Sequence, residues 1–248
     1  MSNRLRVTLN KCLLGMQKHA QAPCVLCGAR SDRHGLCAGC RCDLPRLPPT
    51  SCAVCAMPLT VPGVCGACLQ RPPRYDAVIA AQVYAAPLDR LIQRYKYGAD
   101  IRLAPTLAQL LAAHVRSRPD LLIPMPLAPR RLRERGFNPA LELARTLART
   151  QDCTLTIDLC RRVIETPPQA LLPWSARARN VRRAFVCDGN LRGLTVAVVD
   201  DVLTTGATLD ELARVLKRAG AARVEGWVVA RAVPRLWRRR DDEVGPTT

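Results

Sequence analysis

The residues that most clearly indicate a chemical function lie at 196–209, which read VAVVDDVLTTGATL. The apolar run at 196–199 predicts a strand buried on both faces of a parallel sheet. Asp200 and Asp201 follow at its carboxyl end, and a loop of small hydroxyl residues at 204–208 leads into a helical pattern. Backbone N–H groups, threonine hydroxyls and the helix dipole at such a loop would together hold a phosphate.

The two aspartates call for a ligand group other than the phosphate. Their charge would repel it, and consecutive strand side chains point to opposite faces. They suit hydroxyls or a divalent cation, so a ligand with a phosphate, vicinal hydroxyls and a metal-bound diphosphate fits the whole run. The run resembles the signature of the type I phosphoribosyltransferases, which bind phosphoribosyl pyrophosphate (PRPP). The resemblance implies that Asp200 and Asp201 hold the ribose hydroxyls with Mg²⁺ and that residues 204–208 cradle the 5′-phosphate.

By the same resemblance, the expected PRPP-binding residues form one continuous run: Asp200, Asp201, Val202, Leu203, Thr204, Thr205, Gly206, Ala207 and Thr208. If the site turns over PRPP, the residues expected to carry catalysis are Asp200, Asp201, Lys96 and Arg135. The lysine and the arginine are candidates to neutralise a departing pyrophosphate.

Cysteine is the second chemically informative residue type. Thirteen cysteines in a chain with cytosolic character indicate metal binding rather than disulfides. Eight of them form four C-x-x-C pairs, as tetrahedral zinc requires: Cys24 with Cys27, Cys37 with Cys40, Cys52 with Cys55, and Cys65 with Cys68. Nine residues separate the inner cysteines of each half, which indicates an internal duplication.

Residues 23–69 contain no aromatic side chain and few large aliphatic ones. Burial alone could not fold so small a segment, whereas structural Zn²⁺ contributes roughly 10–16 kcal/mol per site. We therefore expect two zinc sites. Local quartets, 24/27/37/40 and 52/55/65/68, are favoured because each repeat can close on itself, and a cross-braced arrangement that joins 24/27 with 52/55 stays open.

The elements that must position these groups are predicted from apolar periodicity. Strands are expected at 75–85 and 121–123, and helices at 87–98 and 103–115. Asn138 is a plausible N-cap for a helix that starts at Pro139. Residues 130–138 are interpreted as a strongly basic loop after a strand, either a second anion contact or a solvated surface.

Residues 161–185 form another basic segment without clear periodicity, and their length indicates an arm or lid. Side chains from this arm and from the basic loop are candidates to contact pyrophosphate or nucleic acid. They are Arg135, Asn138, Gln169, Arg177, Arg179 and Asn180.

Net charge and hydropathy limit the partners. Lys and Arg number 38 against 20 acids, a formal charge of +18, which favours phosphate-rich partners or else reflects a solvated surface. No apolar run approaches the roughly 20 residues that cross a bilayer, and residues 1–20 lack the features of a signal peptide. The sequence predicts a cytoplasmic protein. A basic amphipathic helix within 1–22 packs on the protein or, alternatively, lies peripherally at the inner membrane.

The order of motifs along the chain resembles the ComF family. Double zinc knuckles precede Tyr-Lys-Tyr-Gly at 95–98, Pro-x-Pro at 124–126 and Arg-Gly-Phe-Asn at 135–138; Thr-Pro-x-Gln, Arg-x-x-Asn-Val and the 200–209 run follow. The resemblance implies an α/β fold of the type I phosphoribosyltransferase class, a mostly parallel sheet flanked by helices behind a double zinc-ribbon module. Pro139 departs from the family pattern, which has Gln there.

The implied organisation has four parts: a basic helix at 1–22, the zinc-ribbon module at 23–70, the phosphoribosyltransferase-like domain at 71–235 and a flexible tail at 236–248. The implied function is that of a PRPP-binding protein that handles single-stranded DNA during natural transformation, together with other DNA-uptake proteins. Two alternatives stay open. One is a salvage phosphoribosyltransferase, and the other is a PRPP-sensing regulator that binds nucleic acid.

Overall fold

The computed structural model describes residues 23–32, 34–164 and 183–234 and divides the chain into two compact units, Met1–Asp43 and Leu44–Thr248. The first unit contains one four-cysteine group, and the second contains the other group together with the sheet. The predicted N-terminal helix and C-terminal tail lie outside the described residues. The domain boundaries expected after residues 22, 70 and 235 stay predictions.

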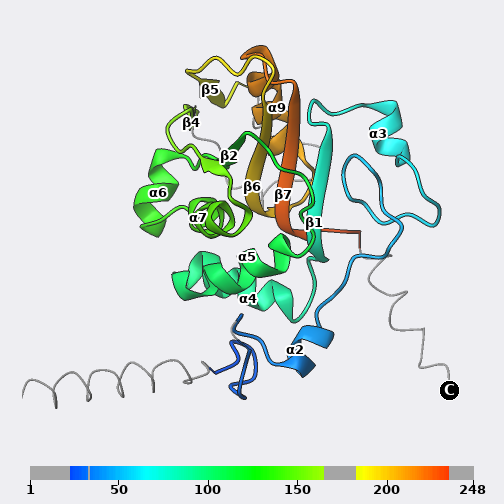
Figure 1. Ribbon diagram of the computed structural model, residues 1–248, viewed down its shortest axis with the longest axis vertical. Coiled ribbons are helices and arrows are strands. Elements are labelled where there is room, and N and C mark those ends of the chain that lie inside the picture. The colour runs from blue at the N-terminus through cyan, green and yellow to red at the C-terminus, as the bar shows by residue number, and fades with distance from the viewer. Residues whose placement is uncertain (1–22, 33, 165–182, 235–248) are drawn as a thin grey trace, which may run out of the picture. The chain divides into compact units, whose positions relative to one another are not determined.

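The second unit is built on a five-stranded sheet with the strand order β1-β7-β6-β2-β3, in which each neighbouring pair is parallel (Figure 1). Its strands are β1 (Ala77–Val83), β2 (Leu121–Pro124), β3 (Thr154–Leu155), β6 (Thr195–Leu203) and β7 (Arg223–Arg231). β6 and β7 are central and almost wholly buried, as their continuous apolar runs require. β4 (Cys160–Arg162) and β5 (Phe185–Cys187) form a separate antiparallel pair.

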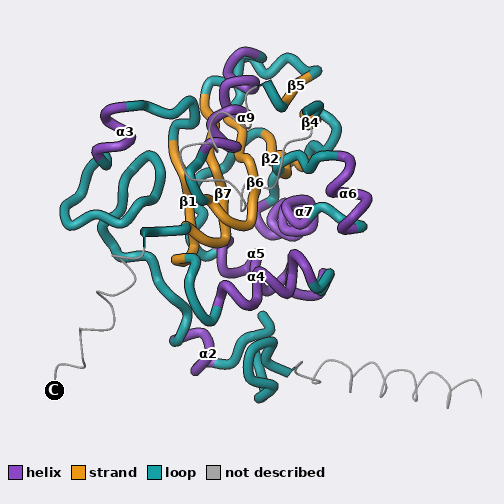
Figure 2. The backbone as a smooth tube through the Cα atoms, turned by 180° about the vertical axis from the view of Figure 1, so that it is seen from behind, coloured by secondary structure: helices purple, strands orange, loops and turns teal. Residues whose placement is uncertain are grey.

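Helices surround this sheet. They are α3 (Gly66–Gln70), α4 (Leu88–Tyr97), the 3-10 helix η1 (Ile101–Leu103), α5 (Ala104–Ala112), α6 (Pro129–Arg135), α7 (Pro139–Gln151) and α9 (Ala207–Arg218). α5 and α7 contact the sheet, and α4 lies beside α5 in both views (Figures 1 and 2). The first unit contributes α2 (Ala38–Cys42).

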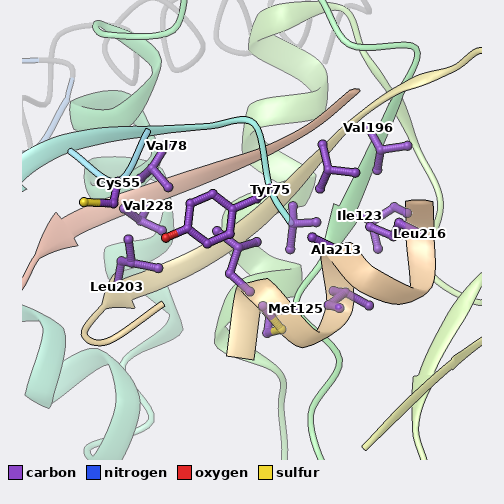
Figure 3. Close-up of a cluster of buried hydrophobic side chains, with 14 of the residues drawn as sticks. Cys55, Tyr75, Val78, Ile123, Met125, Val196, Leu203, Ala213, Leu216 and Val228 are labelled. Carbon is purple, nitrogen blue, oxygen red and sulfur yellow. The ribbon is translucent and has the colours of Figure 1, made fainter. Parts of the chain in front are cut away.

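Successive side chains along each strand point to opposite faces of the sheet, and this alternation decides which helices each residue contacts. Leu209 and Leu212 of α9 share one buried cluster with Val196 and Val198 of β6, and β1 and β7 contribute Val78 and Val228 to it. Figure 3 shows part of this cluster around Tyr75. The intervening strand residues lie outside the cluster and face α5 and α7, so the sheet is covered on both sides.

Most expected elements are confirmed. β1, β2, α4, α7, β6 and α9 lie where the sequence predicts them, although β6 continues through both aspartates to Leu203 and α9 begins at Ala207 rather than Leu209. The interpretation of 130–138 as a loop is wrong, because α6 occupies most of that range. Pro129 starts the helix, the Arg130 Nε to Glu134 Oε1 ion pair of 2.7 Å spans one turn, and Gly136 ends it with φ of 78°.

Candidate functional site

A cleft of about 370 Å³ opens where β6 and β2 end, the edge of an open parallel sheet at which α/β proteins bind ligands. Its floor includes Asp200 and Asp201, and one wall is the 203–209 turn. Four cationic side chains from three elements also line it: Lys96 from α4, Arg131 and Arg135 from α6, and Arg162 from β4. The structure thus brings Lys96, Arg135 and Asn138 together with all the expected PRPP-loop residues except Thr205, which does not line the cleft.

The loop between β6 and α9 has the geometry of an anion cradle. Gly206 is the N-cap of α9, with φ of 81° in the left-handed region, where a side chain would be strained. The Thr205 hydroxyl accepts a hydrogen bond of 3.2 Å from the Ala207 N–H and fixes the turn. The start of a 12-residue helix therefore borders the cleft and directs its positive dipole end there.

Asp201 is buried, with 3% of its surface exposed, and forms an ion pair with Lys96. The Asp201 Oδ1 to Lys96 Nζ distance is 2.7 Å, and Oδ1 also accepts a 2.6 Å hydrogen bond from the Val202 N–H. Burial alone would lower the pKa of Lys96, but the charges of Asp201 and Asp200 outweigh it and raise that pKa. Lys96 therefore carries its positive charge permanently beside the two acids.

Asp200 lies on the opposite strand face from Asp201, as the alternation predicts. Burial and the neighbouring Asp201 carboxylate raise the pKa of Asp200 to about 7, while Lys96 acts in the opposite direction. Near neutral pH this group holds a proton part of the time. A divalent cation would displace that proton, because a bound cation favours the carboxylate form.

Several cleft residues are not among the site residues that the sequence predicts, and Arg131, Arg162 and Tyr97 are the chemically important ones. The Arg135 guanidinium lies 5.3 Å from the centre of the Tyr97 ring, and that tyrosine is 73% exposed. Burial, followed by the nearby Arg131 charge, lowers the pKa of Arg162. Its position in a short strand beside the cleft is set by pairing with Phe185, which no local pattern in the sequence indicates.

Asn138 is an N-cap, as predicted. Its Oδ1 accepts a 3.1 Å hydrogen bond from the Ala140 N–H, and its Nδ2 donates one of 3.1 Å to the Met125 carbonyl. These bonds position α7 at the cleft. The other contact candidates, Gln169, Arg177, Arg179 and Asn180, lie outside the described residues.

The eight cysteines form two compact groups, the local quartets rather than the cross-braced arrangement: Cys24, Cys27, Cys37 and Cys40, then Cys52, Cys55, Cys65 and Cys68. Within each group the four sulfur atoms lie within 4.8 Å of one another. The Cys27–Cys37 and Cys55–Cys65 sulfur distances are both 3.6 Å. Four thiolates on a tetrahedral zinc ion with bonds of about 2.3 Å would lie about 3.8 Å apart. Both groups could therefore hold Zn²⁺.

The two groups also have the same backbone conformation. Gly28 N–H donates to Cys24 O at 2.9 Å, and Ala56 N–H donates to Cys52 O at 3.0 Å. Residues 28 and 56 both have positive φ, 76° and 55°. A five-residue helix begins directly after Cys37 in one group and directly after Cys65 in the other. These equivalences show a structural repeat, and the internal duplication that the spacing indicates stays a prediction.

Comparison with known proteins agrees with this geometry. The family described as "Phosphoribosyl transferase domain" matches residues 132–244. "DNA utilization protein YhgH" of Shigella flexneri is 35% identical over 80% of this chain and 91% of its own. "Competence protein F" of Haemophilus influenzae is 34% identical over 81% and 92%, and "Competence protein ComFC" of Bacillus subtilis is 26% identical over 79% and 84%. The chain belongs to the ComF family.

Within this ComF-family protein, the expected fold class is confirmed: a parallel sheet with helices on both faces, of the phosphoribosyltransferase type, preceded by four-cysteine groups. Among the residues that the structure describes, no helix is both long and apolar enough to span a bilayer.

Proposed function

We propose that this ComF-family protein binds PRPP with Mg²⁺ in the cleft and acts in the handling of single-stranded DNA during DNA uptake. The names of its relatives, which refer to competence and DNA utilization, support the biological setting. The observation that carries the ligand assignment is the convergence in one cleft of two acids, a helix N-terminus and four cations.

Each part of PRPP has a counterpart in the cleft. The 5′-phosphate suits the amides and hydroxyls of 204–208, and the ribose hydroxyls suit Asp200 and Asp201. The diphosphate suits the cations of the cleft, of which Lys96 is charged at all relevant pH values. Mg²⁺ accompanying the diphosphate would neutralise part of its charge.

Calorimetry with PRPP and Mg²⁺ tests the ligand assignment. Gly206→Ala places a methyl group 2.8 Å from the Tyr75 hydroxyl on a left-handed backbone, so it should weaken PRPP binding at least about tenfold. Gly193→Ala is the matched control, because Gly193 has φ of 79° and open space around it, far along the chain from the loop. Equal affinity for both variants and the unaltered protein would refute the cradle.

The nucleic-acid part of the proposal rests on α6, which lines the cleft with Arg131 and also carries the exposed Arg133. Binding of a single strand to these arginines should weaken with salt, with a log–log slope that falls by about 0.7 for each phosphate contact removed. Arg133→Gln should reduce the slope, and Arg145→Gln on α7, where Arg145 is paired with Glu142, should not. A shallow slope in the unaltered protein would count against DNA binding.

A second candidate function is phosphoribosyl transfer to a nucleobase. The exposed Tyr97 ring at the cleft favours it, since a base can stack on such a ring. A base nitrogen would form the bond to the anomeric carbon while the bond from that carbon to the pyrophosphate oxygen breaks, and the base would release a proton. Pyrophosphate release from PRPP should then require one specific base, and Tyr97→Phe should retain the activity that Tyr97→Ala loses. No release with any base would eliminate this candidate.

A further inference from the structure

Arg231, the last residue of β7, is buried, with only 3% of its surface exposed. Within the described part of the chain no salt bridge joins it to an acid, and its guanidinium instead donates to backbone carbonyls. Nε donates to Cys55 O at 2.8 Å, and Nη1 donates to Leu203 O at 3.0 Å, to Ala232 O at 2.7 Å and to Thr204 O. A buried cation needs such bonds, and each carbonyl is fixed by the arrangement in return.

The carbonyls that Arg231 holds belong to two parts of the molecule with different chemistry. Cys55 is a member of the second four-cysteine group, whereas Leu203 ends β6 and Thr204 opens the anion loop. One planar guanidinium therefore connects the backbone of a metal knuckle directly to the backbone of the proposed PRPP cradle. A rigid fork of donors is suited to this, because it fixes both partners in one geometry.

Tyr75 provides a second connection between the same two parts. Its ring is 5% exposed and lies in one buried cluster with Cys55, Leu203 and Leu209; Figure 3 shows its hydroxyl directed toward the side of Cys55 and Leu203. The hydroxyl oxygen would be only 2.8 Å from a methyl group on Gly206, so it presses closely on the loop backbone. The knuckle and the loop thus share two independent neighbours.

We infer that Arg231 is a positioning residue that couples metal in the second four-cysteine group to ligand in the anion loop. This inference rests on the proposed binding of PRPP. A filled knuckle holds the Cys55 carbonyl in place, which orients Arg231, which in turn holds Leu203 and Thr204 in the ligand-binding conformation. The first four-cysteine group, in the other unit, takes no part.

Coupling between two sites is reciprocal, so a ligand on the loop must retain metal in the second group by the same factor that the metal improves ligand affinity. Allosteric couplings of this type are commonly about 5- to 150-fold, and we expect a value near tenfold. Zinc loss requires the filled knuckle to open, and a ligand that stabilises the filled state opposes this opening. The expected signature is therefore zinc loss from the second group that slows when PRPP and Mg²⁺ are bound.

The test measures zinc transfer from the full-length, zinc-loaded protein to a chromogenic chelator, with and without saturating PRPP and Mg²⁺. Cys27→Ser removes a ligand of the first group and so identifies the kinetic phase that belongs to the second. We expect PRPP to slow the second-group phase about tenfold and to leave the first-group phase unchanged. The first group thereby serves as an internal control for any direct effect of PRPP on the chelator.

A matched pair of variants assigns the coupling to Arg231. Arg231→Lys keeps the charge but replaces the fork with one point donor that cannot reach Cys55 and Thr204 together. Arg223→Lys makes the same exchange at the other end of β7, where Arg223 pairs with Glu225. The exchange at Arg231 should reduce the PRPP effect on zinc loss to less than twofold, and the exchange at Arg223 should preserve it. A merely structural role would change stability in both states without removing the PRPP dependence.

Calorimetry on the same zinc-loaded protein separates the two proposals. Bound PRPP with no change in either kinetic phase would overturn the coupling and leave the proposed function intact. No PRPP binding at all would overturn both. The measurement on the unaltered protein decides whether metal and ligand are coupled, even if Arg231→Lys fails to fold.

Discussion

The two four-cysteine groups have the same spacing and backbone hydrogen bonds but different surroundings. In the first group Cys27 is exposed and Cys37 and Cys40 are half-buried. In the second, Cys52, Cys55 and Cys68 are buried in the same cluster as Tyr75 and the sheet. One copy of a duplicated motif has thus become part of the core that carries the cleft.

A small difference in sequence accounts for this divergence. Where the second repeat has Met57 and Leu59, the first has Ala29 and Ser31 at the equivalent positions. Met57 and Leu59 pack against the core cluster and bury apolar surface. Zinc-ligand spacing therefore fixes the knuckle, whereas the side chains beside the ligands decide whether it joins a larger core.

The largest expected effect comes from removing one ligand in each group. Cys55→Ser should destabilise the second unit, called here the sheet unit, by at least about 5 kcal/mol, because structural zinc contributes roughly 10–16 kcal/mol and this group is part of the core. The main thermal midpoint should fall by about 10–20 °C. Cys27→Ser should move that midpoint by no more than about 2 °C, since its group belongs to the other unit. Similar midpoints for both variants would remove the distinction between the groups.

The ion pair beneath the cleft tests whether the two units are stabilised separately. Lys96→Met leaves the buried Asp201 charge without its partner and should cost about 3–5 kcal/mol in the free energy of unfolding. Adding Asp201→Asn to that variant should recover much of the loss. Zinc release from the first group should be the same in all of these variants. A faster release there would show that the two units stabilise each other.

Asp200 should give the sheet unit a pH dependence of its own. Its folded pKa of about 7 lies above the ordinary value of 3.8, so its contribution to stability is present below pH 3.8 and is lost as pH rises through 7. Asp200→Asn should therefore stabilise this unit at pH 8 by up to about 4 kcal/mol, the free-energy equivalent of a pKa raised from 3.8 to about 7.

The same substitution should abolish binding of PRPP with Mg²⁺, and in the unaltered protein that binding should strengthen as pH rises through 7. Denaturation and calorimetry from pH 5 to 8 measure both effects. A destabilised Asp200→Asn variant at pH 8 would contradict the raised pKa.

A weaker effect is expected at one equivalent backbone position in the two four-cysteine groups. Gly28 and Ala56 are equivalent and both have positive φ, which costs a residue with a side chain about 1–2 kcal/mol. Gly28→Ala should speed zinc loss from the first group about fivefold, and Ala56→Gly should slow zinc loss from the second by a similar or smaller factor. Competition with a chelator measures both rates of zinc loss. Slower loss from Gly28→Ala or faster loss from Ala56→Gly would show that the repeats do not share this turn.

Local patterns were sufficient for much of the molecule. The apolar run of β6, the N-cap at Asn138 and the zinc spacing each depend on neighbours within a few residues, so the sequence predicts them directly. The α6 helix differs from the prediction because its four arginines were interpreted as a basic loop, either a second anion contact or a solvated surface. The signals that mark its ends, Pro129 and Gly136, and the Arg130–Glu134 pair were all present in the sequence.

Three kinds of chemical group can be read from the amino-acid sequence: an acidic pair, an anion loop and two sets of four thiols. Which of these groups meet depends on the tertiary structure. Parallel pairing of β6 with β7 places Arg231 beside Leu203, and folding of the second knuckle onto the same unit places Cys55 within reach, 176 residues away along the chain. Contacts at such separation depend on how whole elements pack, and no spacing rule within one segment encodes them.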